Sequence, residues 1–183
     1  ARQKFDSARV LFDEVKRTPG AYQAASRYYA GYLAFRKKDW DQALYDLREA
    51  EKDTAYKTVV PPLLASTYYI QGRYDDVLNY HQEIRDKKYY SRVKDQDNLN
   101  LISGLAYYQK NDYQKALPRL EAYARQNQLT PALTYRLGFS ELNTGDTQNA
   151  IRHFKTLAGR EDTLSQYAAF NLGMLYAREE NYP

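Results

Sequence analysis

The chain of 183 residues contains no cysteine, two histidines and one methionine. Without cysteine it has no disulfide framework, thiol nucleophile or cysteine-ligated zinc site. No apolar run approaches the roughly 20 residues that a helix needs to cross a bilayer. Its 27 basic and 23 acidic residues are mixed along the chain, and no continuous basic stripe typical of nucleic-acid binding can be traced. We therefore predict no membrane-spanning segment and no nucleic-acid partner.

Catalytic and metal-binding motifs are equally scarce. The sequence has no paired-histidine zinc motif, no phosphate-binding glycine loop and no nucleophile elbow. The stretch 95–98 begins like a calcium loop, but Asn100 stands where that loop needs glycine. His81 and His153 are interpreted as packing or surface residues. We therefore predict a protein that is not an enzyme and that has no cofactor and no metal.

What the chain does have is an internal repeat. Small residues recur with separations of 34, 39, 34 and 35 residues, at Gly31, Ala65, Gly104, Gly138 and Gly173. A second small register follows twelve residues later, at Ala43, Val77, Ala116 and Ala150. Glycine inside a helix costs roughly 0.8–1.0 kcal/mol relative to alanine, so its recurrence indicates that a second helix approaches closely there.

Larger residues flank the second small register. An aromatic residue precedes it by three positions at Trp40, Tyr74 and Tyr113, and Thr147 is the exception. A bulky residue follows it by four positions at Leu47, His81, Leu120 and Phe154. In period and residue order the chain resembles the tetratricopeptide repeat (TPR) family. The resemblance implies an all-α, right-handed superhelical solenoid of antiparallel helix pairs.

The repeat covers nearly the whole chain, so we predict a single array over residues 1–183. It consists of a half repeat at 1–22, whole repeats at 24–57, 58–91, 97–130 and 131–164, and a half repeat at 165–183. Because both ends fall inside a repeat, we interpret the chain as a piece of a longer array. We expect Phe5, Phe12, Leu172 and Tyr176 to be left uncovered and to mediate self-association through the two ends.

Turn and cap signals lie between the predicted helices. Gly72, Asn111 and Gly145 are residue types that tolerate the left-handed conformation at a helix end. Asp39, Asp112 and Asp146 follow these turns and are predicted N-caps, as is Thr130 before a proline. Thr163 and Gln166 have the spacing of a capping box.

Two irregularities interrupt the pattern. The step from Ala65 to Gly104 is five residues too long, and the surplus falls at 87–94. This stretch is either a longer surface loop or an insertion that contacts a ligand, since insertions map to one face of a solenoid. Pro118 lies inside a predicted helix and is expected to kink it.

Twenty tyrosines are more than the repeat accounts for. In the TPR family the first helices of the repeats line a concave face. Transferring those positions predicts a ligand groove lined by Tyr28, Tyr32, Phe35, Arg36, Ser66, Tyr69, Leu105, Tyr108, Gln109, Tyr135, Phe139, Asn143 and Phe170. Whether these rings face a ligand or are hidden by helix packing remains open at this point.

The predicted lining is aromatic and carries few charges, unlike TPR modules that clamp an acidic peptide tail with basic side chains. Tyrosine combines an apolar ring with a hydroxyl group, which suits peptide interfaces. We therefore predict a protein–protein interaction scaffold that binds a peptide or helical segment. The alternative is a module that stacks a carbohydrate or peptidoglycan fragment on the same rings. Residues 56–70 also resemble the large multi-TPR proteins of Gram-negative cell envelopes, which points towards the periplasm or outer membrane.

Overall fold

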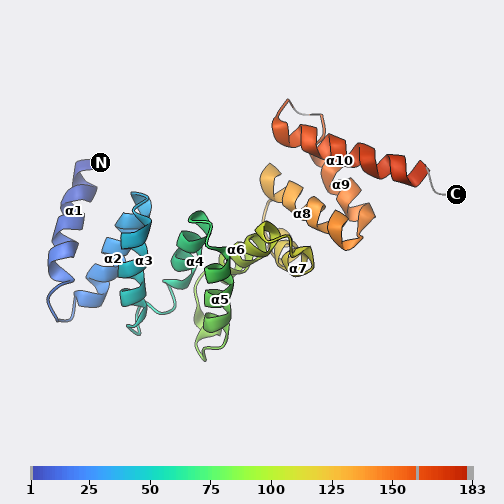
Figure 1. Cartoon of the computed structure of the whole chain (residues 1–183). Helices are drawn as coiled ribbons and strands as arrows, with labels where there is room; N and C mark the ends of the chain where they lie inside the picture. Colours follow the sequence, from blue (N-terminus) through green and yellow to red (C-terminus); the bar gives the residue numbers. More distant parts are fainter. Residues whose placement is uncertain (1, 160, 181–183) are drawn as a thin grey trace. The chain divides into compact units, whose positions relative to one another are not determined.

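In the computed structural model, residues 2–159 and 161–180 are described, with side chains for 5–159 and 161–178. Every regular element in these residues is helical (Figure 1). The elements are α1 (Arg2–Val15), α2 (Gln23–Arg36), α3 (Trp40–Glu51), α4 (Pro61–Ile70), α5 (Tyr74–Arg85), the short 3-10 helix η1 (Tyr90–Arg92), α6 (Gln96–Gln109), α7 (Tyr113–Ala124), α8 (Pro131–Thr144), α9 (Thr147–Leu157) and α10 (Thr163–Glu180).

The chain divides into two compact units, residues 1–102 and residues 103–183, and the boundary falls within α6. In the first unit α1 packs on α2, α2 on α3, α3 on α4 and α4 on α5, as the blue-to-green ribbon of Figure 1 shows. Leu47 of α3, Leu64 of α4 and Ile84 of α5 are fully buried between these helices. Each helix is therefore held mainly by its neighbours in sequence, as in repeat proteins.

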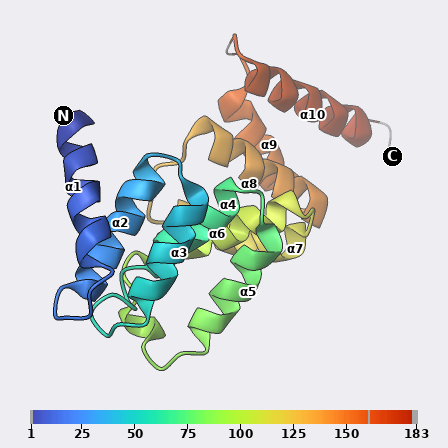
Figure 2. The ribbon, with the colours of Figure 1, turned by 60° about the vertical axis from the view of Figure 1, so that its left-hand side comes forward.

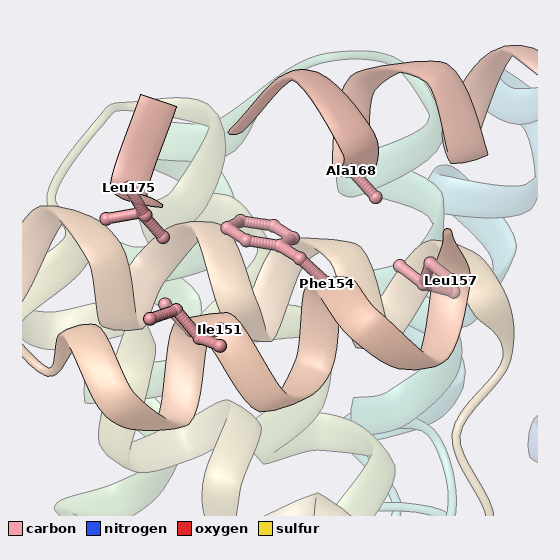
Figure 3. Packing of buried hydrophobic residues seen from close by; sticks show 6 residues of the cluster. Ile151, Phe154, Leu157, Ala168 and Leu175 are labelled. Carbon is pink, nitrogen blue, oxygen red and sulfur yellow. The ribbon is translucent and has the colours of Figure 1, made fainter. Parts of the chain in front are cut away.

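In the second unit α7 packs on α8, α8 on α9 and α9 on α10. These helices appear in yellow to red in Figure 2. Figure 3 shows Phe154 and Leu157 of α9 directed towards α10, which contributes Ala168 and Leu175 to the same cluster. The continuous helix α7 contains Pro118, and the kink expected there stays a prediction.

The turns between paired helices confirm the predicted left-handed turn residues. Gly72, Asn111 and Gly145 have φ values of 72°, 59° and 90°, and Lys38 takes the same left-handed conformation at 63°. In this conformation the chain leaves one helix and enters the next within three residues. Asp112 and Asp146 then accept hydrogen bonds from the backbone N–H groups of Lys115 and Asn149, as N-caps do.

For two predicted N-caps, Asp39 and Thr163, the expected capping hydrogen bond is not formed. Asp39 occupies the N-cap position of α3 but makes no side-chain cap. Its Oδ2 instead accepts a hydrogen bond of 2.9 Å from the charged Arg9 of α1. Thr163 is the first residue of α10, and the capping oxygen belongs to Asp162, whose Oδ1 accepts from the Ser165 backbone N–H. Thr130 caps α8 as predicted.

The surplus residues at 87–94 form a loop that returns to the preceding repeat. The Lys94 backbone N–H donates to the Thr58 carbonyl at 2.7 Å, and Val93 is buried. Lys57 lies over the ring of Tyr89 at 5.1 Å. These contacts attach the loop to the turn before α4 and favour the interpretation as a structural loop.

The glycines at the small register make the closest approaches between paired helices. A Cβ atom built on Gly31 would lie 3.0 Å from the Leu47 backbone nitrogen, and one on Gly104 would lie 2.9 Å from the Arg119 Cβ. For Gly138 the nearest atom is the His153 Cβ at 3.1 Å. A Cβ on Gly173 in α10 would meet nothing within 4 Å. Three of these glycines therefore serve close packing, whereas the face of α10 that carries Gly173 is open.

Candidate functional site

Aromatic side chains from four helices of the second unit contact one another in a row. We call this row the aromatic ladder, and it consists of Tyr108 of α6, Tyr113 of α7, Phe139 and Tyr135 of α8, and Tyr167 of α10. Ring centroids are 5.6 Å apart for Tyr108 and Tyr113, and 5.6 Å for Tyr113 and Phe139. They are 5.8 Å apart for Phe139 and Tyr135, and 6.4 Å for Tyr135 and Tyr167. These separations fall within the range of attractive aromatic pairs.

Local structure explains how the ladder forms. Tyr135 and Phe139 are four residues apart on α8, so they lie on one face of the helix and stack with an interplanar angle of 23°. Tyr108 and Tyr113 flank the left-handed turn at Asn111, which places one ring on each side of it. The rings of this unit are thus aligned by one helix face and one tight turn.

Amide and guanidinium groups lie beside the rings. Asn171 Nδ2 donates to the Tyr135 hydroxyl at 3.2 Å and to the Tyr167 carbonyl at 2.8 Å. Asn143 is exposed, and its Nδ2 donates to the Phe139 carbonyl at 2.7 Å. The Arg136 guanidinium lies 6.0 Å from the centroid of Tyr108. The ladder therefore has an apolar body with hydrogen-bonding groups along its border.

Partial burial changes the acidity of the ladder hydroxyls. It raises the pKa of Tyr135 above its ordinary value, and the hydrogen bond from Asn171 opposes this effect. Burial also raises the pKa of Tyr113. Both groups are therefore neutral hydroxyls at physiological pH. They can donate or accept one hydrogen bond, and they offer no fixed charge to a ligand.

The structure brings together only some of the residues predicted for the groove. In the second unit Tyr108, Tyr135 and Phe139 belong to the ladder and Asn143 borders it. Leu105 is 9% exposed and belongs to the core, so its side chain is not accessible to a ligand. Gln109 and Phe170 are exposed, the latter at 68%.

In the first unit the predicted residues form separate contacts. Tyr28 stacks on Tyr56 at 4.9 Å, Phe35 meets Trp40 edge-on at 5.5 Å, and Tyr69 meets Tyr74 at 5.5 Å. Tyr32 is half-buried, and the Ser66 hydroxyl donates to the Pro62 carbonyl in its own helix. Arg36 is exposed and lines a pocket with Phe5, Asp6 and Lys38.

Several residues of these contacts were missing from the predicted groove, among them Tyr56, Tyr113, Tyr167 and Asn171. Tyr56 lies between helices, where the repeat pattern assigns no register, and Tyr113 stands at the aromatic register of a second helix, which was not assigned to the groove. Tyr167 and Asn171 lie one turn apart on α10, and the helical spacing from Phe170 back to Tyr167 could have indicated a shared face. No sequence signal connects Asn171 with Tyr135.

Two polar clusters are buried away from the ladder. Glu141 of α8 is buried, and its Oε2 lies 2.7 Å from His153 Nδ1 of α9. In the first unit the Tyr80 hydroxyl donates to Glu51, and Arg48 lies 4.4 Å from the centroid of the Tyr80 ring. The Glu141–His153 pair joins the consecutive helices α8 and α9, whereas the contacts of Tyr80 join α5 to α3.

The described residues contain neither a metal-binding cluster nor a membrane-spanning helix. In the part of the chain that the structure describes, no group of three or more histidine, cysteine or acidic side chains is placed to hold a metal ion. None of the described helices is long and apolar enough to cross a membrane.

Comparison with solved structures identifies the fold. A point mutant of MamA superimposes with a TM-score of 0.67 at 21% identity, covering 86% of this chain and 88% of that chain. MamA AMB-1 gives 0.64 at 20% identity, with 86% and 93% covered. MamA MSR-1 gives 0.63 at 20% identity, with 86% and 91% covered. These neighbours are TPR-type helical solenoids.

One curated sequence is similar. The RNA polymerase-associated protein CTR9 of Saccharomyces cerevisiae is 26% identical over 142 residues, which are 77% of this chain and 13% of the yeast protein. The chain thus spans about an eighth of that relative's length. No family model matches the chain. The fold is therefore an all-α TPR-type solenoid of antiparallel helix pairs, as the sequence predicted.

Proposed function

We propose that this protein is a non-enzymatic interaction scaffold and that the aromatic ladder of its second unit binds a segment of a partner protein. Solenoids of this type present extended surfaces made by successive helices. The similar MamA structures share this architecture, and the yeast relative is named for its association with RNA polymerase. These likenesses support a protein partner and leave its identity to experiment.

The observation that carries the proposal is the ladder itself. Its rings are only partly covered, and Tyr167 at its end is exposed. Aromatic residues dominate protein interfaces because they bury a large apolar area with few rotatable bonds. The amide groups of Asn143 and Asn171 lie beside the rings and can hydrogen-bond to a peptide backbone.

Ring orientation favours a peptide over a carbohydrate. Phe139 and Tyr135 stack on each other, so each covers one face of the other. Tyr113 meets Phe139 at 72°, which prevents the two rings from presenting one flat platform. A sugar needs an open, flat ring face, whereas an extended side chain fits between rings set at different angles. Binding of carbohydrate or peptidoglycan fragments is the alternative that the experiment must separate.

The experiment starts by selecting binders from a phage-displayed library of random peptides on the immobilised chain. Selected peptides are then synthesised and titrated against the parent chain and against Tyr167→Ala. Tyr45→Ala is the matched control, because Tyr45 is also exposed but lies on α3 in the first unit. We expect Tyr167→Ala to weaken binding about tenfold, as interface aromatics do, and Tyr45→Ala to leave it unchanged.

Salt dependence separates ring burial from charge. Exposed ion pairs are strongly screened between about 0.1 M and about 1 M salt, whereas burial of apolar area is not weakened. We expect the affinity of the selected peptides to change little over this range. A steep loss with salt, or equal effects of the two tyrosine variants, would move binding away from the ladder. If soluble peptidoglycan fragments displace the peptides in a competition titration, that result would support the carbohydrate alternative instead.

Three broader predictions stay part of this proposal. We propose that the half and whole repeats predicted over residues 1–183 form one TPR array. Each predicted whole repeat contains one helix pair of the structure, from α2–α3 to α8–α9. A location in the cell envelope rests on the resemblance of residues 56–70 and stays a prediction, as does the expectation that the protein binds no nucleic acid.

A further inference from the structure

Three helix pairs, α4–α5, α6–α7 and α8–α9, share a contact at one register. The third residue after the small position of the first helix meets the third residue after the small position of the second helix. Tyr68 and Tyr80 meet with ring centroids 6.2 Å apart. The Arg119 guanidinium lies 4.7 Å from the centroid of Tyr107, and His153 lies 2.7 Å from Glu141. The contact is an aromatic pair in α4–α5, a cation–π contact in α6–α7 and a hydrogen bond in α8–α9.

α10 is a first helix by register, and no second helix follows it among the described residues. Its small residue, Gly173, has open space where Gly31, Gly104 and Gly138 meet a second helix. Tyr176, three residues after Gly173, is exposed, and so are Phe170 and Met174. In α8 the residues 35 positions earlier are Tyr135, Phe139 and Glu141, which are half-buried or buried.

α1 is a second helix without a paired first helix. Leu11 stands at the register of Asp46, Tyr80, Arg119 and His153, all of which are buried or half-buried, yet it is 61% exposed. Val15 is also exposed, whereas Ala50, Ile84 and Leu157 at its register are buried. The open side of α1 is therefore the side that faces a first helix in the other pairs.

The open faces differ from those that the sequence predicted. Phe12 was expected to be uncovered, but it stacks on Tyr29 of α2 at 5.3 Å. Leu172 packs against the cluster between α9 and α10. Both belong to the sides of the terminal helices that face their neighbours in the chain, so the exposed apolar residues lie on the opposite sides. Phe5 and Tyr176 are exposed as expected.

We propose that α1 of a second copy of this chain packs on the open face of α10, completing the helix pair that each copy lacks. The template is the interface that the chain already forms between its own paired helices. At the shared register Tyr176 would meet Leu11 of the second copy, two side chains that are compatible without a charge partner. Phe12, which stands at the register of Phe154, would lie near Gly173.

This contact joins one end of a copy to the other end of the next. Such a head-to-tail contact uses two different surfaces and does not close after two copies, so oligomers grow with concentration. The proposal does not depend on ligand binding by the aromatic ladder, because Leu11, Gly173 and Tyr176, which would form the contact, are not ladder residues.

The first test measures the mass of the purified 183-residue chain by sedimentation over a wide concentration range. We expect species larger than the monomer at high concentration. Leu11→Asp should raise the dissociation constant at least about tenfold, because it places a charge in the contact. Val10→Asp is the matched control: Val10 is 66% exposed, and Tyr45, Asn79, Pro118 and Arg152 at its register are also exposed.

The second test uses the absence of cysteine in the natural sequence. The single-cysteine variants Leu11→Cys and Tyr176→Cys are mixed and oxidised, and a mixed cross-linked dimer is expected. The mixture of Val10→Cys with Tyr176→Cys should give markedly less of it. A chain that stays monomeric at every concentration overturns the proposal. It does so also if the reason is that another helix of the same chain covers the open face of α10. Equal effects of the changes at Leu11 and Val10, or no preference in cross-linking, also overturn it.

Discussion

Replacing the register glycines one at a time with alanine should give opposite effects on stability at two positions. At Gly31 a new Cβ would lie 2.8 Å from the Leu47 Cγ and 3.0 Å from the Leu47 backbone nitrogen. The side chain can rotate away, but the backbone nitrogen belongs to α3 and moves only with the helix. At Gly173 the same methyl group would meet nothing within 4 Å.

The two positions share the propensity gain but not the packing cost. Alanine favours the helix over glycine by about 0.8–1.0 kcal/mol at an interior position. Overpacking a filled site costs typically about 1–3 kcal/mol. We therefore expect Gly31→Ala to lower the free energy of unfolding by up to about 2 kcal/mol, and Gly173→Ala to raise it by up to about 1 kcal/mol. Gly138→Ala should fall between them, because its closest contact is 3.1 Å.

The assay is urea unfolding followed by circular dichroism at the lowest usable protein concentration, so that association through α10 does not contribute to apparent stability. Melting temperatures should follow the same order, with shifts of about 2–4 °C per kcal/mol for a chain of this size. Equal stability changes at Gly31 and Gly173 would show that the spacing between α2 and α3 is not what requires glycine. A loss of stability at Gly173 in the monomer would show that its face is covered.

Two further predictions concern the buried polar pairs. His153→Leu should lower the free energy of unfolding by about 2–3 kcal/mol, because it leaves the buried carboxylate of Glu141 without its hydrogen-bond partner on α9. Urea unfolding should show most of that loss recovered in the Glu141→Leu/His153→Leu double variant, and a single variant as stable as the parent would contradict the reasoning. Burial, followed by the charge of Glu51, raises the pKa of Tyr80 far above its ordinary value. Above about pH 10 an unfolded tyrosine loses its proton while folded Tyr80 keeps it, so the free energy of unfolding should fall as pH rises. Urea midpoints should therefore fall less steeply with pH for Tyr80→Phe than for the parent. Identical slopes for the two proteins would contradict this.

The helices and their turns could be predicted from the sequence because their causes are local. A left-handed residue at Asn111 or Gly145 and a following aspartate specify a helix end and a helix start whatever surrounds them. Asp39 shows where local reasoning stops. Its position was predicted correctly, but Arg9, thirty residues earlier, supplies a charged donor that no local pattern reveals.

The candidate site was predicted less completely than the fold. Register transferred from the repeat located Tyr108, Tyr135 and Phe139, which the structure brings into one ladder. It also included Leu105, which is buried, and omitted Tyr167 and Asn171. Register gives the side of a helix on which a residue lies, but exposure depends on which other helix covers that side.

By itself the sequence determined the repeat length, the helix pairs and the positions where paired helices approach closely, because each depends on residue size and backbone preference at fixed spacing. Only the tertiary structure decided which side of each terminal helix is covered. Phe12 and Leu11 are adjacent and both apolar, yet one stacks on Tyr29 and the other is exposed. The physical reason is that burial belongs to the contact between two helices, and the sequence of one helix does not state where its neighbour packs.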